Sequence, residues 1–244
     1  MSVEFEGKVA LITGGARGIG LSITEALVRE GASVFICGRN PATLKMALGQ
    51  LHTFGAEASA AGTVADVRRY DDCRNFVQKA ATRFGRVDIL VNNAGIGIFK
   101  PVDDLTAEEW DASIQTNLSS VFYCCREVVP IMRQQGGGHI FNISSLLAIH
   151  GIAGGSAYCA SKFGVNGLTE AMMQDFRYEG IRVSAIMPGS VASDFGGSAG
   201  SNLHEPWKLA GKDIAKAVID AYRYPGHALV SRIEIRPLQP PRKG

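Results

Sequence analysis

Short apolar runs alternate with longer segments of helical periodicity along the chain. The first run, Lys8 to Thr13, ends in glycines, and the segment from Ile19 to Arg29 that follows it has a helical pattern. Continuous apolar runs of this length are typical of parallel strands that are covered on both faces. The alternation therefore predicts βα units and an α/β fold, a doubly wound, mostly parallel seven-stranded sheet with helices on both faces.

The individual elements follow from the same pattern. The predicted strands cover 8–13, 33–37, 57–63, 86–91, 139–144, 181–187 and 228–235. The predicted helices cover 19–29, 40–54, 106 to beyond 123, 156–178 and 212–222. Asn40-Pro41 is typical of a helix N-cap with proline at the first position, and Thr106 with Glu109 is a capping-box signal. The proline-rich tail 237–244 should have no regular structure.

Length and composition fit one domain, 1–244. With 244 residues and 46% hydrophobic content, the chain can bury a large core. Segment 194–207 is rich in Gly, Ser and Asn, with Leu203 and Trp207 as apolar positions. It predicts a mobile flap over a substrate, and the alternative is a flexible surface loop without contacts.

Charge and cysteine usage narrow the function class. The net charge is only +2 and there is no run of Lys or Arg, so nothing indicates binding to nucleic acid or to an anionic membrane. The five cysteines are odd in number and lack metal-ligand spacing, which predicts reduced, packed thiols and no metal site. Glu4 and Glu6 in the opening stretch argue against a signal peptide, so we expect a cytoplasmic protein.

A glycine-rich turn joins the first predicted strand to the first helix. Its sequence is Thr13-Gly14-Gly15-Ala16-Arg17-Gly18-Ile19-Gly20. Glycines allow positive φ and let a pyrophosphate approach a helix N-terminus, where unpaired N–H groups and the helix dipole favour anions. The position after a strand and before a helix favours a phosphate cradle over a glycine-rich loop without a ligand.

Tyr158 and Lys162 are four residues apart in a predicted helix, so their side chains share one face. A lysine cation about 4 Å from a phenol favours the phenolate by on the order of 4 kcal/mol at an effective dielectric of 20, which lowers the pKa by roughly three units. Tyr158 is then a candidate general acid and base, with Ser145 holding the substrate oxygen. The alternative is a solvated lysine beside a packed ring.

These motifs occur together in a characteristic order. Their order and spacing resemble the compact single-domain branch of the short-chain dehydrogenase/reductase family, and the resemblance extends from about Gly7 to Pro237. The motifs that carry it are the glycine turn, Asn92-Asn93-Ala94-Gly95, Asn117, Ser145, Tyr158, Lys162 and Pro188-Gly189. The resemblance implies a Rossmann-type sheet, a nicotinamide cofactor and a catalytic tetrad of Asn117, Ser145, Tyr158 and Lys162. It also implies that Asn117 anchors a water near Lys162. It further implies a homo-oligomer, a dimer or tetramer, formed through the helices bearing Asn117 and Tyr158 and often through the last strand.

The resemblance also implies a set of cofactor contacts. They are Gly14, Arg17, Gly18, Ile19, Gly20, Arg39, Asp66, Val67, Asn93, Ala94, Gly95, Tyr158, Lys162, Pro188, Gly189, Val191 and Ser193. Sites for NAD usually place an acid after the second strand, to bind the ribose 2′-OH. Here Gly38-Arg39-Asn40 occupies that place, and Arg39 with Arg17 suits a 2′-phosphate. We therefore predict NADP(H), and the alternative is that both arginines are solvated.

The predicted function is an NADP(H)-dependent oxidoreductase that interconverts a ketone or aldehyde and an alcohol by hydride transfer. One alternative is reduction of a 3-oxoacyl group on acyl-carrier protein, which calls for a basic docking patch. The short segment after Ser193 and a C-terminus without the glycine-rich ending of the fatty-acid-synthesis reductases weaken that alternative. A non-enzymatic NADP sensor or scaffold is the other alternative, and the intact tetrad argues against it.

Overall fold

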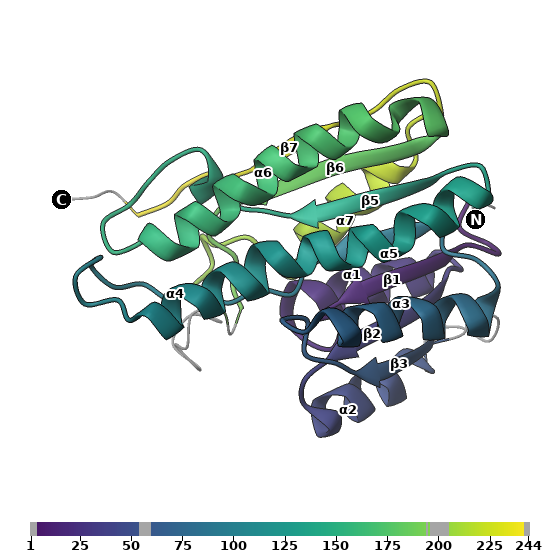
Figure 1. Ribbon diagram of the computed structural model, residues 1–244, viewed down its shortest axis with the longest axis horizontal. Coiled ribbons are helices and arrows are strands. Elements are labelled where there is room, and N and C mark those ends of the chain that lie inside the picture. Colours follow the sequence, from purple (N-terminus) through teal and green to yellow (C-terminus); the bar gives the residue numbers. More distant parts are fainter. Residues whose placement is uncertain (1–3, 54–59, 194, 196–204, 242–244) are drawn as a thin grey trace.

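A computed structural model describes residues 4–53, 60–193, 195 and 205–241 (Figure 1). Its strands are β1 (Val9–Thr13), β2 (Ser33–Gly38), β3 (Ala60–Val64), β4 (Ile89–Asn92), β5 (Gly138–Ile143), β6 (Ile181–Pro188) and β7 (Arg232–Ile235). Its α-helices are α1 (Gly18–Arg29), α2 (Pro41–Leu51), α3 (Tyr70–Phe84), α4 (Ala107–Ile114), α5 (Ser120–Gln134), α6 (Ser156–Phe176) and α7 (Gly211–Tyr222). The predicted fold class is confirmed.

The strands form one sheet in the order β3-β2-β1-β4-β5-β6-β7. Every neighbouring pair is parallel, from β2 with β3 to β6 with β7. The strand order reverses between β1 and β4, since β2 and β3 lie on one side of β1 while β4 to β7 follow on the other. In open α/β sheets ligands bind beyond the carboxyl ends of the strands at such a point.

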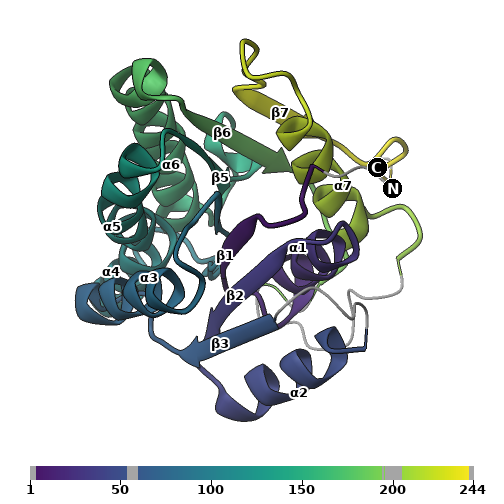
Figure 2. The same ribbon diagram turned by 90° about the vertical axis from the view of Figure 1, so that its right-hand side faces the viewer.

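Two helical layers cover the sheet, because side chains alternate between its faces. Ala10 and Ile12 of β1 pack in one core with residues of α1, α2 and α7, whereas Val9 and Leu11 pack in a second core with residues of α3, α5 and α6. Figure 2 shows the same division, with α1, α2 and α7 on one side of the sheet and α3 to α6 on the other.

Several element boundaries differ from the prediction. Strand β4 begins at Ile89 and not at residue 86, because the backbone of Val87 bonds to the side chain of Gln135 through both its N–H and its carbonyl. Strand β7 begins at Arg232 and not at residue 228, because the N–H of Ala228 closes a turn onto Pro225. Strand β3 begins at Ala60, and residues 54–59 of the predicted elements lie outside the described part.

The helices agree more closely with the sequence pattern. The side chain of Asn40 caps α2 by accepting from the N–H groups of Ala42 and Thr43, at 2.9 and 3.0 Å. The capping box of Thr106 and Glu109 is also present at α4. The helix predicted from 106 to beyond 123 is interrupted by a π-helical turn, Gln115–Ser119, and α3 was not predicted.

Among the residues described, none of the helices has both the length and the hydropathy needed to cross a bilayer.

Candidate active site

The glycine turn connects β1 directly to α1. Gly14 and Gly18 have φ values of 65° and 54°, which side chains with a Cβ rarely adopt. A Cβ on Gly20 would lie 2.2 Å from the carbonyl oxygen of Gly14, so only glycine lets the first turn of α1 pack this closely. Helix α1 has no acidic residue in its first turn, and its N-cap residue Arg17 forms no side-chain capping bond. The N–H groups at the helix start therefore suit an anion.

The loop after β4 is fastened to this turn. The hydroxyl of Thr13 accepts from the N–H groups of Asn93 and Ala94, both at 3.0 Å. The side-chain amide of Asn93 donates to the carbonyls of Thr13 and Gly14, at 3.0 and 3.2 Å. The side chain of Asn93 thus braces the turn, and the Thr13 hydroxyl positions the loop after β4, a role that the glycine pattern did not predict.

Arg17, Arg39 and Asp66 line one connected cavity. Asp66 accepts from Nε of Arg68 at 3.0 Å, and this hydrogen bond is the main reason that its pKa lies below the ordinary value. The charge of Arg39 lowers the pKa of Asp66 further, so the carboxylate is ionised near neutral pH. Asn40 and Thr43 also line the cavity, and neither was among the predicted cofactor contacts.

The residues predicted to transfer the proton meet where β5 and α6 come together. Ser145 follows β5, and its Oγ accepts from the N–H of Leu147 at 3.1 Å, which starts the short 3-10 turn Leu146–Ala148. Tyr158 and Lys162 project from α6, and both are buried. Ser145 and Tyr158 line the same cavity, and the Ser145 side chain lies close enough to Tyr158 to influence the pKa of its phenol.

The electrostatics of Tyr158 differ from the prediction. Burial raises the pKa of Tyr158 to about 12, and the nearby Ser145 side chain offsets this rise only in part. Nζ of Lys162 is 5.8 Å from the centre of the Tyr158 ring and donates to the carbonyl of Ile143 at 2.9 Å. Burial also lowers the pKa of Lys162 to about 8. The predicted lowering of the phenol pKa is therefore wrong for this geometry, because desolvation of the buried phenol is the largest influence on its pKa.

Asn117 lies in the π-helical turn and connects three segments. Its Oδ1 accepts from the N–H of Ile96 at 2.8 Å, and its Nδ2 donates to the carbonyl of Ile96 and to Oγ of Ser161, at 2.9 and 3.0 Å. A Cβ on Gly95 would lie 3.3 Å from Oδ1 of Asn117 and 3.8 Å from Nζ of Lys162. Gly95 therefore allows the Asn117 side chain to approach this closely, whereas the distance to Lys162 is an ordinary van der Waals contact. π-Helical turns inside α-helices occur frequently at functional sites.

One cavity of about 1070 Å³ contains most of the predicted site. Its lining includes Gly14, Arg17, Gly18, Ile19, Arg39, Asp66, Val67, Asn93, Ala94, Gly95, Ser145, Tyr158, Lys162, Pro188, Gly189, Val191 and Ser193. Two predicted residues, Gly20 and Asn117, lie behind this wall and act through packing and hydrogen bonds. Phe195 and Trp207 of the predicted flap line the cavity, as does Lys208, which follows the flap. Residues 194 and 196–204 of the flap lie outside the described part.

The cavity also has walls that were not predicted. They include Ile96, Phe99, Thr116, Leu147, Ile152, Arg236, Pro237, Pro240 and Pro241. The last four belong to the C-terminal tail, which follows β7 past the ends of the strands. A proline-rich composition predicts only irregular structure, so the sequence held no signal for this placement.

The residues present fit a nicotinamide dinucleotide. The cavity runs from the N-terminus of α1, which suits a diphosphate, to the buried ammonium of Lys162. Among the described residues, no carboxylate forms an ion pair with Lys162. A buried cation of this kind suits neutral oxygen ligands such as ribose hydroxyls. Arg17 and Arg39 line the cavity as well and suit a phosphate.

Comparisons with known proteins agree with this geometry. Residues 8–203 match the family model described as short chain dehydrogenase. An uncharacterised oxidoreductase of Staphylococcus saprophyticus is 33% identical over 97% of this chain and 100% of its own. A 3α-hydroxysteroid dehydrogenase of Mediterraneibacter gnavus is 36% identical over 80% of this chain and 78% of its own.

A solved structure leads to the same conclusion. A metagenomic short-chain oxidoreductase in complex with NADP is 32% identical and superposes with a TM-score of 0.84 over 97% of this chain and 100% of that one. Together with the fold and the cavity, these matches show that the chain belongs to the short-chain dehydrogenase/reductase family of oxidoreductases.

Proposed function

We propose that the protein is an NADP(H)-dependent oxidoreductase that interconverts a ketone or aldehyde and the corresponding alcohol, with Tyr158 as general acid and base. The observation that carries the proposal is the placement of Ser145 and Tyr158 together at the wall of one cavity, beside the buried ammonium of Lys162. When bound, NADPH supplies the hydride that reduces the carbonyl carbon.

Residues of the chain bind the substrate oxygen and supply its proton. Ser145 and Tyr158 hydrogen-bond the carbonyl oxygen and hold it in place. Because the pKa of Tyr158 is about 12, the phenol carries its proton near neutral pH and can donate it to the alkoxide that forms. In the reverse direction the alcohol returns its proton to Tyr158.

Lys162 and Asn117 support this pair from behind. Lys162 would hold the nicotinamide ribose, and its charge favours the phenolate that remains after proton donation. Asn117 positions α6 through its hydrogen bond to Ser161, one residue before Lys162. We propose that the water anchored by Asn117 then connects Lys162 to solvent and restores the proton.

The preference for NADP(H) is proposed from charge. Arg39 and Arg17 both line the cavity, and the turn after β2 has no acidic side chain to repel a 2′-phosphate. Among the described residues, Asp66 is the one carboxylate that lines the cavity, and its charge is balanced by that of Arg68. A structurally similar short-chain oxidoreductase was solved with NADP, which supports the same choice.

The test is consumption of NADPH and of NADH, followed by absorbance, against a panel of ketones, aldehydes and a 3-oxoacyl thioester. We expect turnover of at least one simple carbonyl compound, with NADPH favoured over NADH. Binding of NADPH without reduction of any member of the panel would contradict the proposal and favour a sensor. Reduction of the thioester alone would favour the acyl-carrier-protein alternative.

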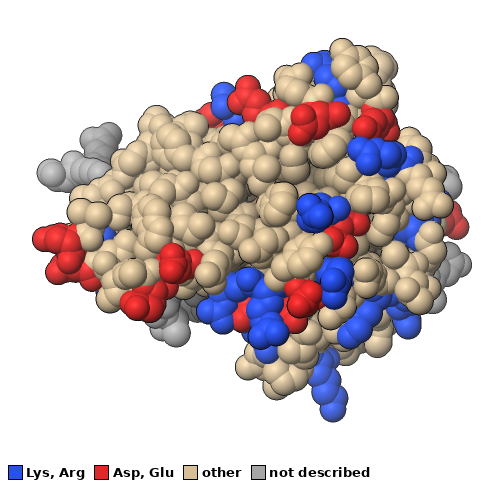
Figure 3. Space-filling view, viewed as in Figure 1, with Lys and Arg blue, Asp and Glu red and all other residues tan. Residues whose placement is uncertain are grey.

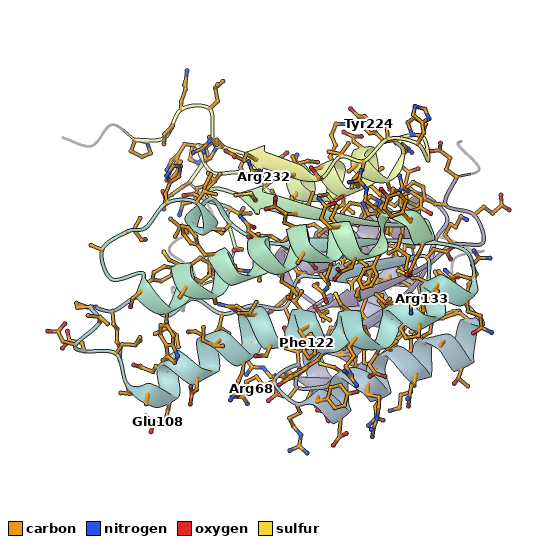
Figure 4. All side chains as sticks on the ribbon, turned by 45° about the horizontal axis from the view of Figure 1, so that its top comes forward. Arg68, Glu108, Phe122, Arg133, Tyr224 and Arg232 are labelled. Carbon is orange, nitrogen blue, oxygen red and sulfur yellow. The ribbon has the colours of Figure 1, made fainter. Side chains whose placement is uncertain are left out.

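We also propose that the protein forms a homo-oligomer, a dimer or tetramer, through α5 and α6. Figure 3 shows that the face formed by these helices carries few Lys, Arg, Asp or Glu side chains. Phe122 on α5 and Phe163 on α6 are 47% and 48% exposed. Figure 4 shows Phe122 and Arg133 at separate positions along α5. Exposed aromatic rings on an uncharged face are typical of subunit contacts.

A further inference from the structure

Two aromatic rings from separate segments contact Tyr158. The ring centres of Phe99 and Phe195 lie 5.4 and 5.6 Å from that of Tyr158. Both rings line the cavity, and they remain 45% and 40% exposed. Large aromatic rings usually bury their area, and rings left accessible inside a cavity are available to an apolar ligand.

A glycine between these rings allows their close approach. A Cβ on Gly97 would lie 2.7 Å from Cε1 of Phe195 and 2.8 Å from Cε2 of Phe99. Any side chain at this position would therefore displace one ring or both. The absence of a side chain at Gly97 lets the two rings converge beside the phenol.

Other residues at this end of the cavity extend the apolar surface. Leu147 and Ile152 follow Ser145 in the chain, and both line the cavity. The tail contributes Pro237, whose Cδ would lie 3.0 Å from a Cβ on Gly189. The tail is thus packed onto the turn after β6 and forms part of the wall.

Among the described residues after 204, two cations, Lys208 and Arg236, line the cavity, and both already interact with carboxylates. Nζ of Lys208 lies 2.9 Å from Oε1 of Glu205, and Nη2 of Arg236 lies 2.8 Å from Oε2 of Glu234. An anionic group on the substrate would have to compete with these carboxylates for the cations. The charge balance therefore favours a neutral substrate over an anionic one.

We propose that this end of the cavity binds a neutral, apolar ring ketone or the corresponding secondary alcohol, and that Phe99 is the residue that determines specificity for the ring. The inference rests on the proposed function, since it assumes that the carbonyl is placed at Ser145 and Tyr158. It names the substrate class that the aromatic rings of the cavity recognise.

The test measures binding and turnover separately. Calorimetric titrations use the enzyme saturated with NADP⁺, in which ketones cannot be reduced. The ligands are 2-decalone, 4-oxocyclohexanecarboxylate and the neutral ethyl ester of that acid, so that the last two differ in charge on the same ring. We expect 2-decalone and the ester to bind, and the carboxylate to bind more weakly than the ester by about tenfold or more.

Variants assign the effect to Phe99. We expect Phe99→Ala to weaken 2-decalone binding by about tenfold or more, and Phe99→Leu to weaken it less, because part of the apolar contact is kept. Val102→Ala is the matched control, since Val102 is 73% exposed on the same loop and does not line the cavity. It should bind 2-decalone as the wild type does.

The outcomes separate this inference from the proposed function. Equal affinity for the carboxylate and its ester, or equal affinity of Phe99→Ala and Val102→Ala for 2-decalone, would overturn the inference. If 2-decalone binds as expected but is not reduced when NADPH replaces NADP⁺, the substrate class stands and the proposed reaction fails. If the enzyme reduces small acyclic ketones but does not bind 2-decalone, the proposed reaction stands and the inferred substrate class fails.

Discussion

Nζ of Lys162 and the ring of Tyr158 lie one turn apart on α6, with 5.8 Å between the nitrogen and the ring centre. Both groups are buried, and burial acts on them in opposite directions: it raises the pKa of Tyr158 to about 12 and lowers that of Lys162 to about 8. Near neutral pH the pair thus holds a neutral phenol beside a cation. This is the state from which Tyr158 can donate a proton.

The pH dependence of stability tests the burial of Lys162. Between its folded pKa of about 8 and its ordinary value of 10.5, the unfolded chain binds more protons at this site, so the free energy of unfolding rises with pH. Tyr158 acts in the opposite sense only above its ordinary pKa of 10.0. Replacing Lys162 with Met removes the contribution of this lysine to the pH dependence of the free energy of unfolding.

We therefore expect the unfolding free energy of the wild type, minus that of Lys162→Met, to increase by on the order of 2 kcal/mol from about pH 8 to about pH 10. Urea unfolding of the cofactor-free protein measures this difference at each pH. A difference that stays flat or falls over this range would show that Lys162 is not desolvated.

Arg39 should decide the choice of cofactor. Replacing it with Asp removes a charge-assisted contact to a 2′-phosphate and adds an acceptor for a ribose 2′-OH. We expect the ratio of kcat/KM with NADPH to kcat/KM with NADH to fall by about tenfold to a hundredfold. Arg177→Asp, which makes the same change of charge beyond the end of α6, is the control. An unchanged ratio in Arg39→Asp would refute the assignment.

Two glycines in helices give a matched test of the turn. Gly20→Ala places a Cβ 2.2 Å from the carbonyl of Gly14 and should destabilise the protein by about 1–3 kcal/mol or more. Gly49→Ala, in α2, meets no atom within 4 Å and should stabilise it by up to about 1 kcal/mol. Thermal unfolding compares the two variants, and equal melting temperatures would contradict the close packing at Gly20.

The face of α5 and α6, which carries few charged side chains, gives a prediction about assembly. Phe122→Asp places a charge on this face and should shift the protein to a smaller species in light scattering after gel filtration. Met46→Asp, on exposed α2, is the control and should leave the mass unchanged. If wild type and both variants have the mass of one chain, α5 and α6 are not an interface.

The sequence was most informative where local chemistry fixes the structure. The N-cap of Asn40 and the capping box of Thr106 and Glu109 are present because a side chain and nearby N–H groups suffice to form them. Helix α3 also had readable signals, including acids in its first turn and Gly85 at its C-terminus with φ of 75°. Its existence could therefore have been predicted from the sequence.

Other features depend on contacts between distant segments. The π-helical turn at Asn117 comes with hydrogen bonds to Ile96 and Ser161, which no local pattern encodes. The pKa of Tyr158 depends on burial, so helical spacing alone predicted the wrong direction. The tail joins the wall at Pro237 only because β7 brings it past Gly189.

The central claim is that Tyr158 transfers the proton. The most direct measurement is kcat together with the Kd of NADPH for Tyr158→Phe, which removes the hydroxyl and keeps the ring that contacts Phe99 and Phe195. We predict that kcat falls by about a hundredfold to ten-thousandfold while the Kd of NADPH stays close to that of the wild type. Retention of normal kcat would contradict the account.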